Sequence, residues 1–287
     1  MSLRHQQTPN NWKPPSADLE LREGLWQARQ VTAVSYPEEG NEVCFQVEDA
    51  SYWFQHRLGC IRTILGQFPP AGTLYDIGGG NGYVAAALQA DGTDVALIEP
   101  GPGARNALRR GVRNVIHATL EDARLQPNSL PAAGAFDVVE HIPDAGAFLR
   151  GIRAVLAPGG RFYCTVPACP TLWSEEDVRA GHFQRYTRAT LVRTLQEAGF
   201  TVEFVTYFFT WLTLPVLLFR VLPSRLGLTN RAKLGTVETM RSDHRVPRLL
   251  SGLVARAHAR ELRLLGKRCP LSFGTSLLCV ARLNPAA

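Results

Sequence analysis

Short apolar runs alternate along most of the chain with segments whose apolar residues recur at helical spacing. The apolar runs predict strands at residues 73–77, 94–98, 115–116, 130–136, 161–166, 201–208 and 275–282. The helical spacing predicts helices at residues 83–90, 104–110, 145–156 and 190–198. Strands that alternate with helices favour βαβ units. We therefore predict an α/β fold with a seven-stranded, mostly parallel sheet and helices on both faces.

The regions outside this alternation divide the chain further. Residues 1–47 read as a partly flexible N-terminal extension, in which Leu19, Leu21, Leu25 and Trp26 suggest a short docking helix. Residues 48–67 predict a helix with Asp49 or Ser51 as its cap. Residues 209–272 interrupt the pattern before the last strand, and we expect a helical cap there. The main domain is then formed by residues 48–208 and 273–287.

The strongest local signal is the run DIGGGNG at residues 76–82, which follows a predicted strand and opens a predicted helix. Glycines let the chain turn sharply and let a ligand lie against bare backbone. The helix N-terminus behind them offers free N–H groups. Glu99 ends the next strand, where nucleotide-binding α/β folds place an acid that binds ribose hydroxyls.

Three other interpretations of the glycine run compete with this one. A tight turn without a ligand needs the same residues. A dinucleotide site requires G-x-G-x-x-G, but the third glycine would fall at Tyr83. A P-loop is excluded because no Gly-Lys-Ser/Thr follows.

Five segments together resemble class I S-adenosylmethionine-dependent methyltransferases. They are DIGGGNG (76–82), LIEPG (97–101), FDVVEHIPD (136–144), LAPGGRF (156–162) and SLLCVAR (276–282). A narrower likeness is to bacterial methyltransferases of lipid, quinone and glycan pathways, which share the segments YWFxxR (52–57) and GHxxRYT (181–187). The resemblance implies a Rossmann-like fold, S-adenosylmethionine as cofactor and S-adenosylhomocysteine as product.

The resemblance also implies roles for individual residues. Asp76 and the loop residues Gly78, Gly80, Asn81 and Gly82 would hold the methionine part of the cofactor, and Glu99 its ribose. Leu120 and Glu121 would line the adenine, with Glu121 or Asp122 replacing the acid that many relatives carry at position 119. Phe136 and Asp137 would lie beside the sulfonium. Trp53 and Arg57, four residues apart on one helical face, would cover the cofactor and pair with its carboxylate, although the same spacing suits plain packing.

The acceptor and the general base are left open by the sequence. No Asn/Asp-Pro-Pro-aromatic run follows the fourth strand, which favours an oxygen acceptor on a small molecule over a nucleic-acid amine. A hydroxyl acceptor needs a base, and histidine is the natural one near neutral pH. His182 is the first candidate and His141 the second. Arg185 and Tyr186 follow His182, and Arg185 is also suited to binding an anionic acceptor.

Charge and composition change the picture mainly at the C-terminal end. The 287 residues carry a net charge of +6, but residues 220–287 hold 13 Lys/Arg against three acids. Within the cap, the apolar run 204–219 is followed by a basic amphipathic segment, 246–268. Residues 209–268 suit a lid over a hydrophobic acceptor, contact with an anionic membrane surface, a homodimer contact or core packing.

The remaining composition favours a cytoplasmic enzyme, with membrane association as a variant of that expectation. The six cysteines include no CxxC pair, so we expect neither a disulfide scaffold nor a metal site. The polar start of the chain lacks the apolar core of a signal peptide. Two alternatives are kept: a catalytically inactive binding or regulatory protein, and an RNA-directed methyltransferase that uses the basic end. We expect a small-molecule acceptor rather than a nucleic acid.

Overall fold

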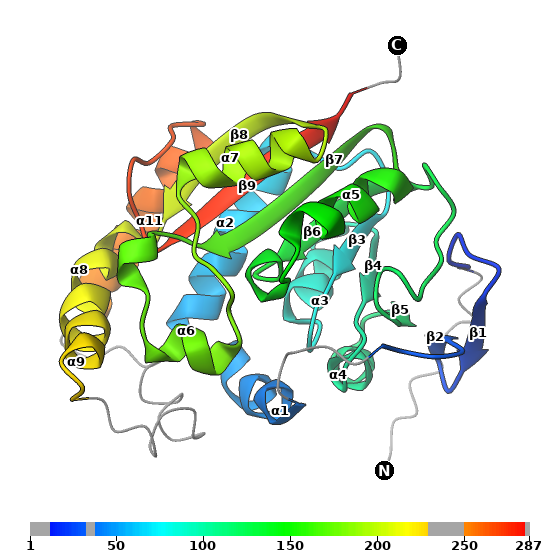
Figure 1. Ribbon diagram of the computed structural model, residues 1–287, viewed down its shortest axis with the longest axis horizontal. Coiled ribbons are helices and arrows are strands. Elements are labelled where there is room, and N and C mark those ends of the chain that lie inside the picture. The colour runs from blue at the N-terminus through cyan, green and yellow to red at the C-terminus, as the bar shows by residue number, and fades with distance from the viewer. Residues whose placement is uncertain (1–11, 33–37, 229–249, 285–287) are drawn as a thin grey trace.

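The computed structural model describes residues 12–32, 38–228 and 250–284, and strands in these ranges form one mixed sheet (Figure 1). The strand order is β1-β2-β5-β4-β3-β6-β7-β9-β8. The strands are β1 (Leu19–Arg22), β2 (Leu25–Ala28), β3 (Leu74–Ile77), β4 (Val95–Ile98), β5 (Asn114–His117), β6 (Leu130–Phe136), β7 (Leu156–Pro167), β8 (Phe200–Phe208) and β9 (Ser276–Leu283). Neighbouring strands from β2 to β7 are parallel, whereas β9 runs antiparallel between β7 and β8.

Helices cover both faces of this sheet. The helices in the described residues are α1 (Glu38–Val47), α2 (Tyr52–Gln67), α3 (Tyr83–Ala90), α4 (Gly103–Arg109), α5 (Ala145–Val155), α6 (Glu175–Ala180), α7 (Arg188–Glu197), α8 (Thr213–Val216), α9 (Leu222–Arg225) and α11 (Ser251–Gly266). Leu149 of α5 and Leu191 of α7 pack in one buried cluster. Residues of α2, α3, α4 and α11 pack in a second cluster with the opposite side of the sheet. The two clusters make the three-layer α/β fold that the sequence predicts.

The predicted elements of the main domain are confirmed. All seven predicted strands are present, and the helices at 83–90, 104–110, 145–156 and 190–198 correspond to α3, α4, α5 and α7. Ser51, rather than Asp49, caps α2 by accepting hydrogen bonds from the N–H groups of Trp53 and Phe54. The sheet is Rossmann-like because the chain leaves β3 toward β4 and β5 on one side and returns to β6 on the other.

The prediction of a docking helix near Leu25 was wrong, because residues 19–28 form the hairpin β1–β2. Glu23 and Gly24 both have left-handed backbone, with φ of 50° and 81°. Two such residues make the tight turn whose twist suits a two-residue hairpin. Strand β2 then pairs with β5, with Trp26 opposite Ile116, so the sheet has nine strands in the described residues instead of seven.

The inserted region before β9 contains helical segments within residues 210–225 and 251–266. The 3₁₀ turn Thr210–Leu212, α8, the π-helical turn Leu217–Val221 and α9 follow one another, and α11 covers most of the predicted basic helix. Residues 246–249 of that predicted helix lie outside the described residues. In the described ranges, no helix combines the length and apolar character needed to cross a membrane.

Candidate functional site

The glycine loop lies at the carboxyl end of β3, where the strand order of the sheet reverses. Open α/β sheets bind ligands in the crevice at this point. Gly78, Gly80 and Gly82 have φ of 69°, 54° and 75°, which L side chains rarely adopt. A Cβ on Gly103 of α4 would come within 2.6 Å of the Gly80 carbonyl carbon. The bare loop is therefore pressed against the start of α4.

Glu99 at the end of β4 is fixed by this loop. Its two carboxylate oxygens accept backbone hydrogen bonds from Gly80 at 2.9 Å and Gly101 at 2.7 Å. Burial raises the pKa of Glu99, and the two N–H donors oppose that rise. Each oxygen keeps a second lone pair, so the carboxylate is able to accept hydrogen bonds from a pair of ribose hydroxyls.

Asp76 lies at the end of β3 and is 1% exposed. Its Oδ2 atom has no hydrogen-bond partner among the described residues. Burial raises the pKa of Asp76 to about 7, with Arg57 lowering it and Glu99 raising it further. An unpartnered buried carboxylate oxygen costs free energy unless a donor satisfies it. The ammonium group of an amino-acid ligand is such a donor, so this end of the loop fits the methionine part of S-adenosylmethionine.

Arg57 of α2 contacts the end of β6, and Trp53 lies beside it on the same helix. The Arg57 guanidinium donates to the Phe136 carbonyl at 2.6 Å and forms an ion pair with Asp137. It also lies 5.4 Å from the centre of the Trp53 ring. Asp137 has left-handed backbone, with φ of 59°. Arg57 is therefore already paired within the protein, next to Phe136 and Asp137, which were expected beside the sulfonium.

Of the other residues expected to bind the cofactor, Asn81 is held by neighbouring side chains, whereas Leu120 and Glu121 lie at the edge of the sheet after β5. The Asn81 side chain donates to Glu48 at 3.2 Å and accepts from Asn106 at 3.0 Å, so it supports the loop from beneath. Leu120 and Glu121 directly follow β5. Leu120 is partly buried against the main core, whereas Glu121 is exposed. Glu121 is thus available to a ligand at this edge, and Leu120 only in part.

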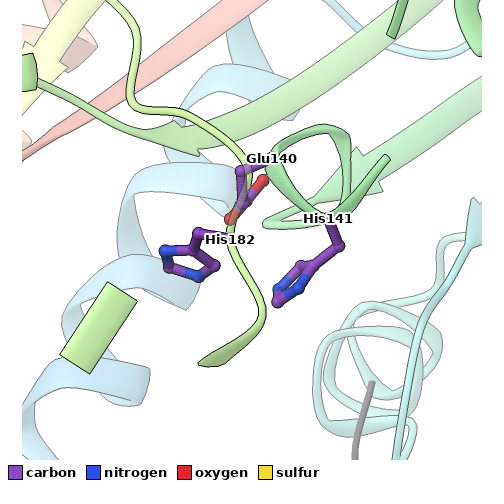
Figure 2. A group of neighbouring side chains, drawn as sticks. All are labelled: Glu140, His141 and His182. Atoms are coloured by element: carbon purple, nitrogen blue, oxygen red, sulfur yellow. The ribbon is translucent and has the colours of Figure 1, made fainter. Parts of the chain in front are cut away.

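The two candidate bases, predicted from distant parts of the chain, lie next to each other. His141 follows β6 and His182 follows α6, and their rings are 4.7 Å apart in an edge-to-face arrangement. Figure 2 shows both imidazoles beneath the Glu140 carboxylate. Burial lowers the pKa of His141 to about 4, and the neighbouring His182 lowers it as well. His141 is therefore uncharged at neutral pH.

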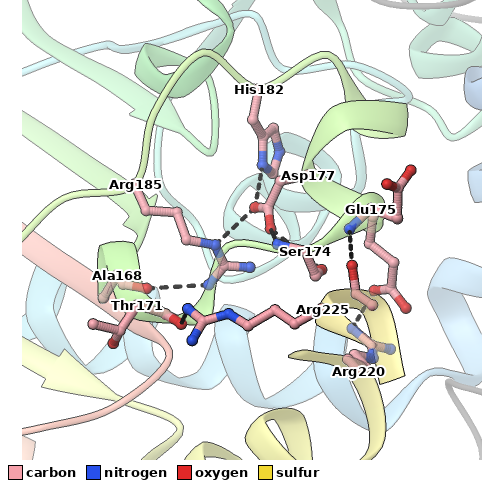
Figure 3. A network of polar contacts seen from close by, with 11 residues as sticks. Ala168, Thr171, Ser174, Glu175, Asp177, His182, Arg185, Arg220 and Arg225 are labelled. Carbon is pink, nitrogen blue, oxygen red and sulfur yellow. Dashed lines mark hydrogen bonds and ion pairs between the residues drawn. The ribbon is translucent and has the colours of Figure 1, made fainter. Parts of the chain in front are cut away.

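His182 is oriented by an aspartate that sequence reasoning missed. Its Nδ1 atom lies 2.9 Å from Oδ1 of Asp177, and the same oxygen accepts from Arg185 at 2.7 Å (Figure 3). Burial acts to raise the pKa of Asp177, but the hydrogen bonds and the charge of Arg185 outweigh it, so the pKa is lowered. The ionised carboxylate holds the proton on Nδ1, which leaves Nε2 as the basic atom.

Arg185 and Tyr186 have supporting positions. Arg185 donates to Asp177 at 2.7 Å and to the Ala168 carbonyl at 3.1 Å. Tyr186 is 1% exposed, and its hydroxyl accepts from Gln184. Burial raises the pKa of Tyr186 well above its usual range. Both residues therefore shape the loop that carries His182.

Glu140, His141 and His182 also form a cluster with the chemistry of a metal site. One ligand atom from each lies within 4.8 Å of the other two. Glu140 is 1% exposed, and its Oε2 has no hydrogen-bond partner among the described residues. Burial, and then the charge of Asp137, raises the pKa of Glu140 well above its ordinary value. These three groups are able to hold a divalent cation, but an imidazole nitrogen that binds a cation cannot also serve as a base.

Asp177 and Glu140 left different signals in the sequence. Asp177 closes a capping box with Ser174, a pattern that is visible as Ser-x-x-Asp at the start of α6. That pattern predicts a helix start and says nothing about a partner histidine. Glu140 stands in FDVVEHIPD, and the Phe183 N–H, more than forty residues away in the sequence, donates to its carbonyl at 2.8 Å.

Comparison with known proteins gives one family match and several distant relatives. The family model described as a methyltransferase domain matches residues 54–204, more than half of the chain. The ubiquinone biosynthesis O-methyltransferase of Sodalis glossinidius is 30% identical over 106 residues, which is 34% of this chain and 43% of that protein. The enzyme of the same name from Xanthomonas axonopodis pv. citri is 28% identical over 141 residues, 45% of this chain and 59% of that protein. The chain thus spans about half the length of the curated relatives that it matches.

Solved structures share the fold at low sequence identity. Phosphoethanolamine N-methyltransferase 2 of Haemonchus contortus, in complex with S-adenosyl-L-methionine, is 16% identical with a TM-score of 0.54, covering 87% of this chain and 58% of that one. The cyclase SpnF is 16% identical with a TM-score of 0.53, covering 90% of this chain and all of that one. These similarities show the fold alone, since one fold hosts several chemistries.

Proposed function

Since the chain belongs to the methyltransferase-domain family, we propose that it transfers the methyl group of S-adenosylmethionine to an oxygen atom of a small, hydrophobic acceptor. S-adenosylmethionine is the cofactor of this family, and the glycine loop with Asp76 and Glu99 fits it. The choice of oxygen is supported by the O-methyltransferase names of the curated relatives. It is also supported by a histidine–aspartate pair suited to removing a hydroxyl proton.

The loop residues would bind the cofactor, which supplies an already activated methyl group. Asp76 would accept the ammonium, and Glu99 the ribose hydroxyls. The fixed positions of Asp137 and Phe136, held by Arg57, would shape the space next to the sulfonium. Alignment of the acceptor and exclusion of water are the main tasks that remain for the protein.

His182 is the proposed general base, and its hydrogen bond to Asp177 is the observation that carries the proposal. The acceptor hydroxyl would give its proton to Nε2 of His182, while Asp177 stabilises the imidazolium that forms. His141 is the weaker candidate because a group with a pKa of about 4 holds a proton poorly at neutral pH. The proposed role of His141 is to pack against His182 and limit its rotation.

Mutation of the two histidines tests this proposal. We expect His182→Ala to lower kcat by about 10²–10⁴-fold, and His141→Ala to lower it less. The measurement is transfer of labelled methyl from S-adenosylmethionine to a panel of hydrophobic phenols and catechols. Titration with S-adenosylhomocysteine is the control and should give unchanged affinity in both variants. Cofactor binding without transfer to any acceptor in the panel would contradict the proposal and favour a binding protein.

Removal of metal ions tests whether His182 acts as a general base or as a metal ligand. With His182 as base, turnover should survive dialysis against EDTA. Loss of turnover that Mg²⁺ or Zn²⁺ restores would instead assign Glu140, His141 and His182 to a cation.

A further inference from the structure

An apolar ridge runs along the outer side of the cap. Leu214, Leu218, Leu222 and Leu226 recur every four residues through α8, the π-helical turn and α9, and all four are exposed. Phe219 stands beside them and is 78% exposed. In Figure 1, α8 and α9 lie at the left edge of the molecule. A stripe of large apolar side chains in water marks an interaction surface.

In the described part of the cap, the charged side chains that face solvent are all positive. Arg256, Arg260 and Arg263 of α11 and Lys267, which directly follows the helix, recur at three- and four-residue spacing and are all exposed. Leu253, 66% exposed, shares their side of the helix because it precedes Arg256 by three residues. In residues 209–228 and 250–272 the single acid is Glu261, which is buried.

The ridge is fixed to the body of the protein rather than projecting from it. Arg220 pairs with Glu176 of α6 at 2.7 Å, and the Ser224 hydroxyl accepts from the Glu175 N–H at 3.1 Å. Arg225 donates to the Thr171 carbonyl at 2.8 Å (Figure 3). Val221 is fully buried on the inner side. The start of the cap also touches α11, where the rings of Trp211 and His258 lie 5.4 Å apart.

We propose that this ridge and the basic face of α11 dock the protein on the surface of an anionic lipid bilayer. Apolar side chains would enter the boundary between headgroups and acyl chains, and the arginines and lysine would pair with lipid phosphates. A second copy of the chain fits less well, because an isologous contact would bring two basic faces together. An anionic bilayer offers an apolar layer and negative charge together.

The docking surface is joined to the candidate site through α6. The cap residues Arg220 and Ser224 bind α6, and the same helix carries Asp177, which orients His182. A bilayer under the ridge would therefore lie on the side of the molecule near the candidate base. That connection rests on the proposed function, whereas lipid binding itself does not.

Vesicle sedimentation with the full chain tests the docking surface. We expect the protein to sediment with phosphatidylcholine vesicles that contain about 30% phosphatidylglycerol, and much less with phosphatidylcholine alone. Binding should weaken as salt is added, because the charge attraction is screened. Equal binding to both kinds of vesicle, or to neither, would overturn the proposal.

Matched variants locate the surface. The double variant Leu218→Asp/Phe219→Asp should weaken vesicle binding at least about tenfold, and Arg256→Glu/Arg260→Glu at least about fivefold. Leu21→Asp on β1 and Arg193→Glu on α7 replace exposed residues elsewhere and should leave binding unchanged. Melting curves check that the variants fold.

Two further readouts separate this proposal from its rivals and from the proposed function. Light scattering that shows a dimer, lost in Leu218→Asp/Phe219→Asp, would assign the ridge to self-association and overturn the proposal. Transfer of methyl to a water-soluble phenol should be unchanged in that variant. Vesicle binding without any methyl transfer would leave the docking surface standing and overturn only the proposed function.

Discussion

Asp76 and Asp177 are both 1% exposed, yet their surroundings shift their pKa values in opposite directions. Asp177 receives hydrogen bonds from His182 and Arg185, which favour its charged form. Asp76 has an Oδ2 atom without a donor, so burial dominates and its pKa rises to about 7. A carboxylate with both oxygens satisfied suits a fixed positioning role. One with an unsatisfied oxygen suits a ligand that brings its own positive charge.

The pKa of Asp76 predicts pH-dependent cofactor binding. Below a pH of about 7 the carboxyl is protonated and loses its attraction for the cofactor ammonium. The Kd for S-adenosylhomocysteine should therefore rise from about pH 8 to about pH 6. Asp76→Asn should raise the Kd at least about tenfold at the higher pH and flatten the profile. Calorimetric titration measures both, and an unchanged pH profile in the variant would refute the role of Asp76.

At the level of elements, the glycine loop depends on how closely α4 approaches it. A Cβ placed on Gly82 would lie 2.7 Å from the Cβ of Ala107. A Cβ placed on Gly103 would lie 2.6 Å from the carbonyl carbon of Gly80. Glu99 of β4 then ties the loop down through the Gly80 N–H. The glycines thus serve two purposes, left-handed backbone in the loop and close contact between the loop and α4.

Substitution of Gly103 tests this packing. In Gly103→Ala the new methyl would overlap the Gly80 backbone, and the loop must shift away from Glu99. We expect a loss of about 1–3 kcal/mol in the free energy of unfolding and weaker binding of S-adenosylhomocysteine. Gly66→Ala is the matched control, because a Cβ there meets nothing within 4 Å. Urea denaturation should show that the control is at least as stable as the parent protein. Titration with S-adenosylhomocysteine should show that its affinity is unchanged.

At the scale of the whole molecule, one buried acid joins the cap to the main domain. Glu261 of α11 lies 2.8 Å from Nε2 of His56 on α2 and accepts from the Phe209 N–H at 2.9 Å. Phe209 stacks on Trp53 with ring centres 5.6 Å apart. The cap is thereby connected to the aromatic residues that lie beside Arg57. His56 is buried in this contact.

Removal of Glu261 should therefore weaken the whole fold. Glu261→Ala leaves His56 and two backbone N–H groups without their acceptor, and we expect a loss of about 3–5 kcal/mol in the free energy of unfolding. Glu197→Ala removes an exposed ion pair with Arg193 and should change the free energy of unfolding by less than about 1 kcal/mol. Urea denaturation followed by circular dichroism compares the two, and equal losses would exclude a special role for Glu261.

The sequence by itself determined the order of the strands and helices and the position of the cofactor loop. The spacing of the apolar residues distinguishes strands from helices, because side chains return to the same face every two residues in a strand and about every 3.6 residues in a helix. The glycine run and Glu99 were recognisable because each belongs to a short local motif, DIGGGNG or LIEPG. Each motif lies at the end of one of two adjacent strands. The hairpin β1–β2 was missed because its pairing with β5 spans nearly a hundred residues, and local spacing does not record such a contact.

Tertiary structure decided which candidate groups meet. His141 and His182 were separate alternatives in the sequence, and packing of α6 against the loop after β6 places them ring to ring with Asp177 behind. The positions of Arg185 and Tyr186 also depend on the fold, because Arg185 donates to Asp177 and to the Ala168 carbonyl, and the buried Tyr186 hydroxyl accepts from Gln184. Hydrogen-bond geometry and burial depend on contacts between distant residues. The sequence therefore specified most of the candidate groups, whereas Asp177 and the roles that these positions allow came only from the folded chain.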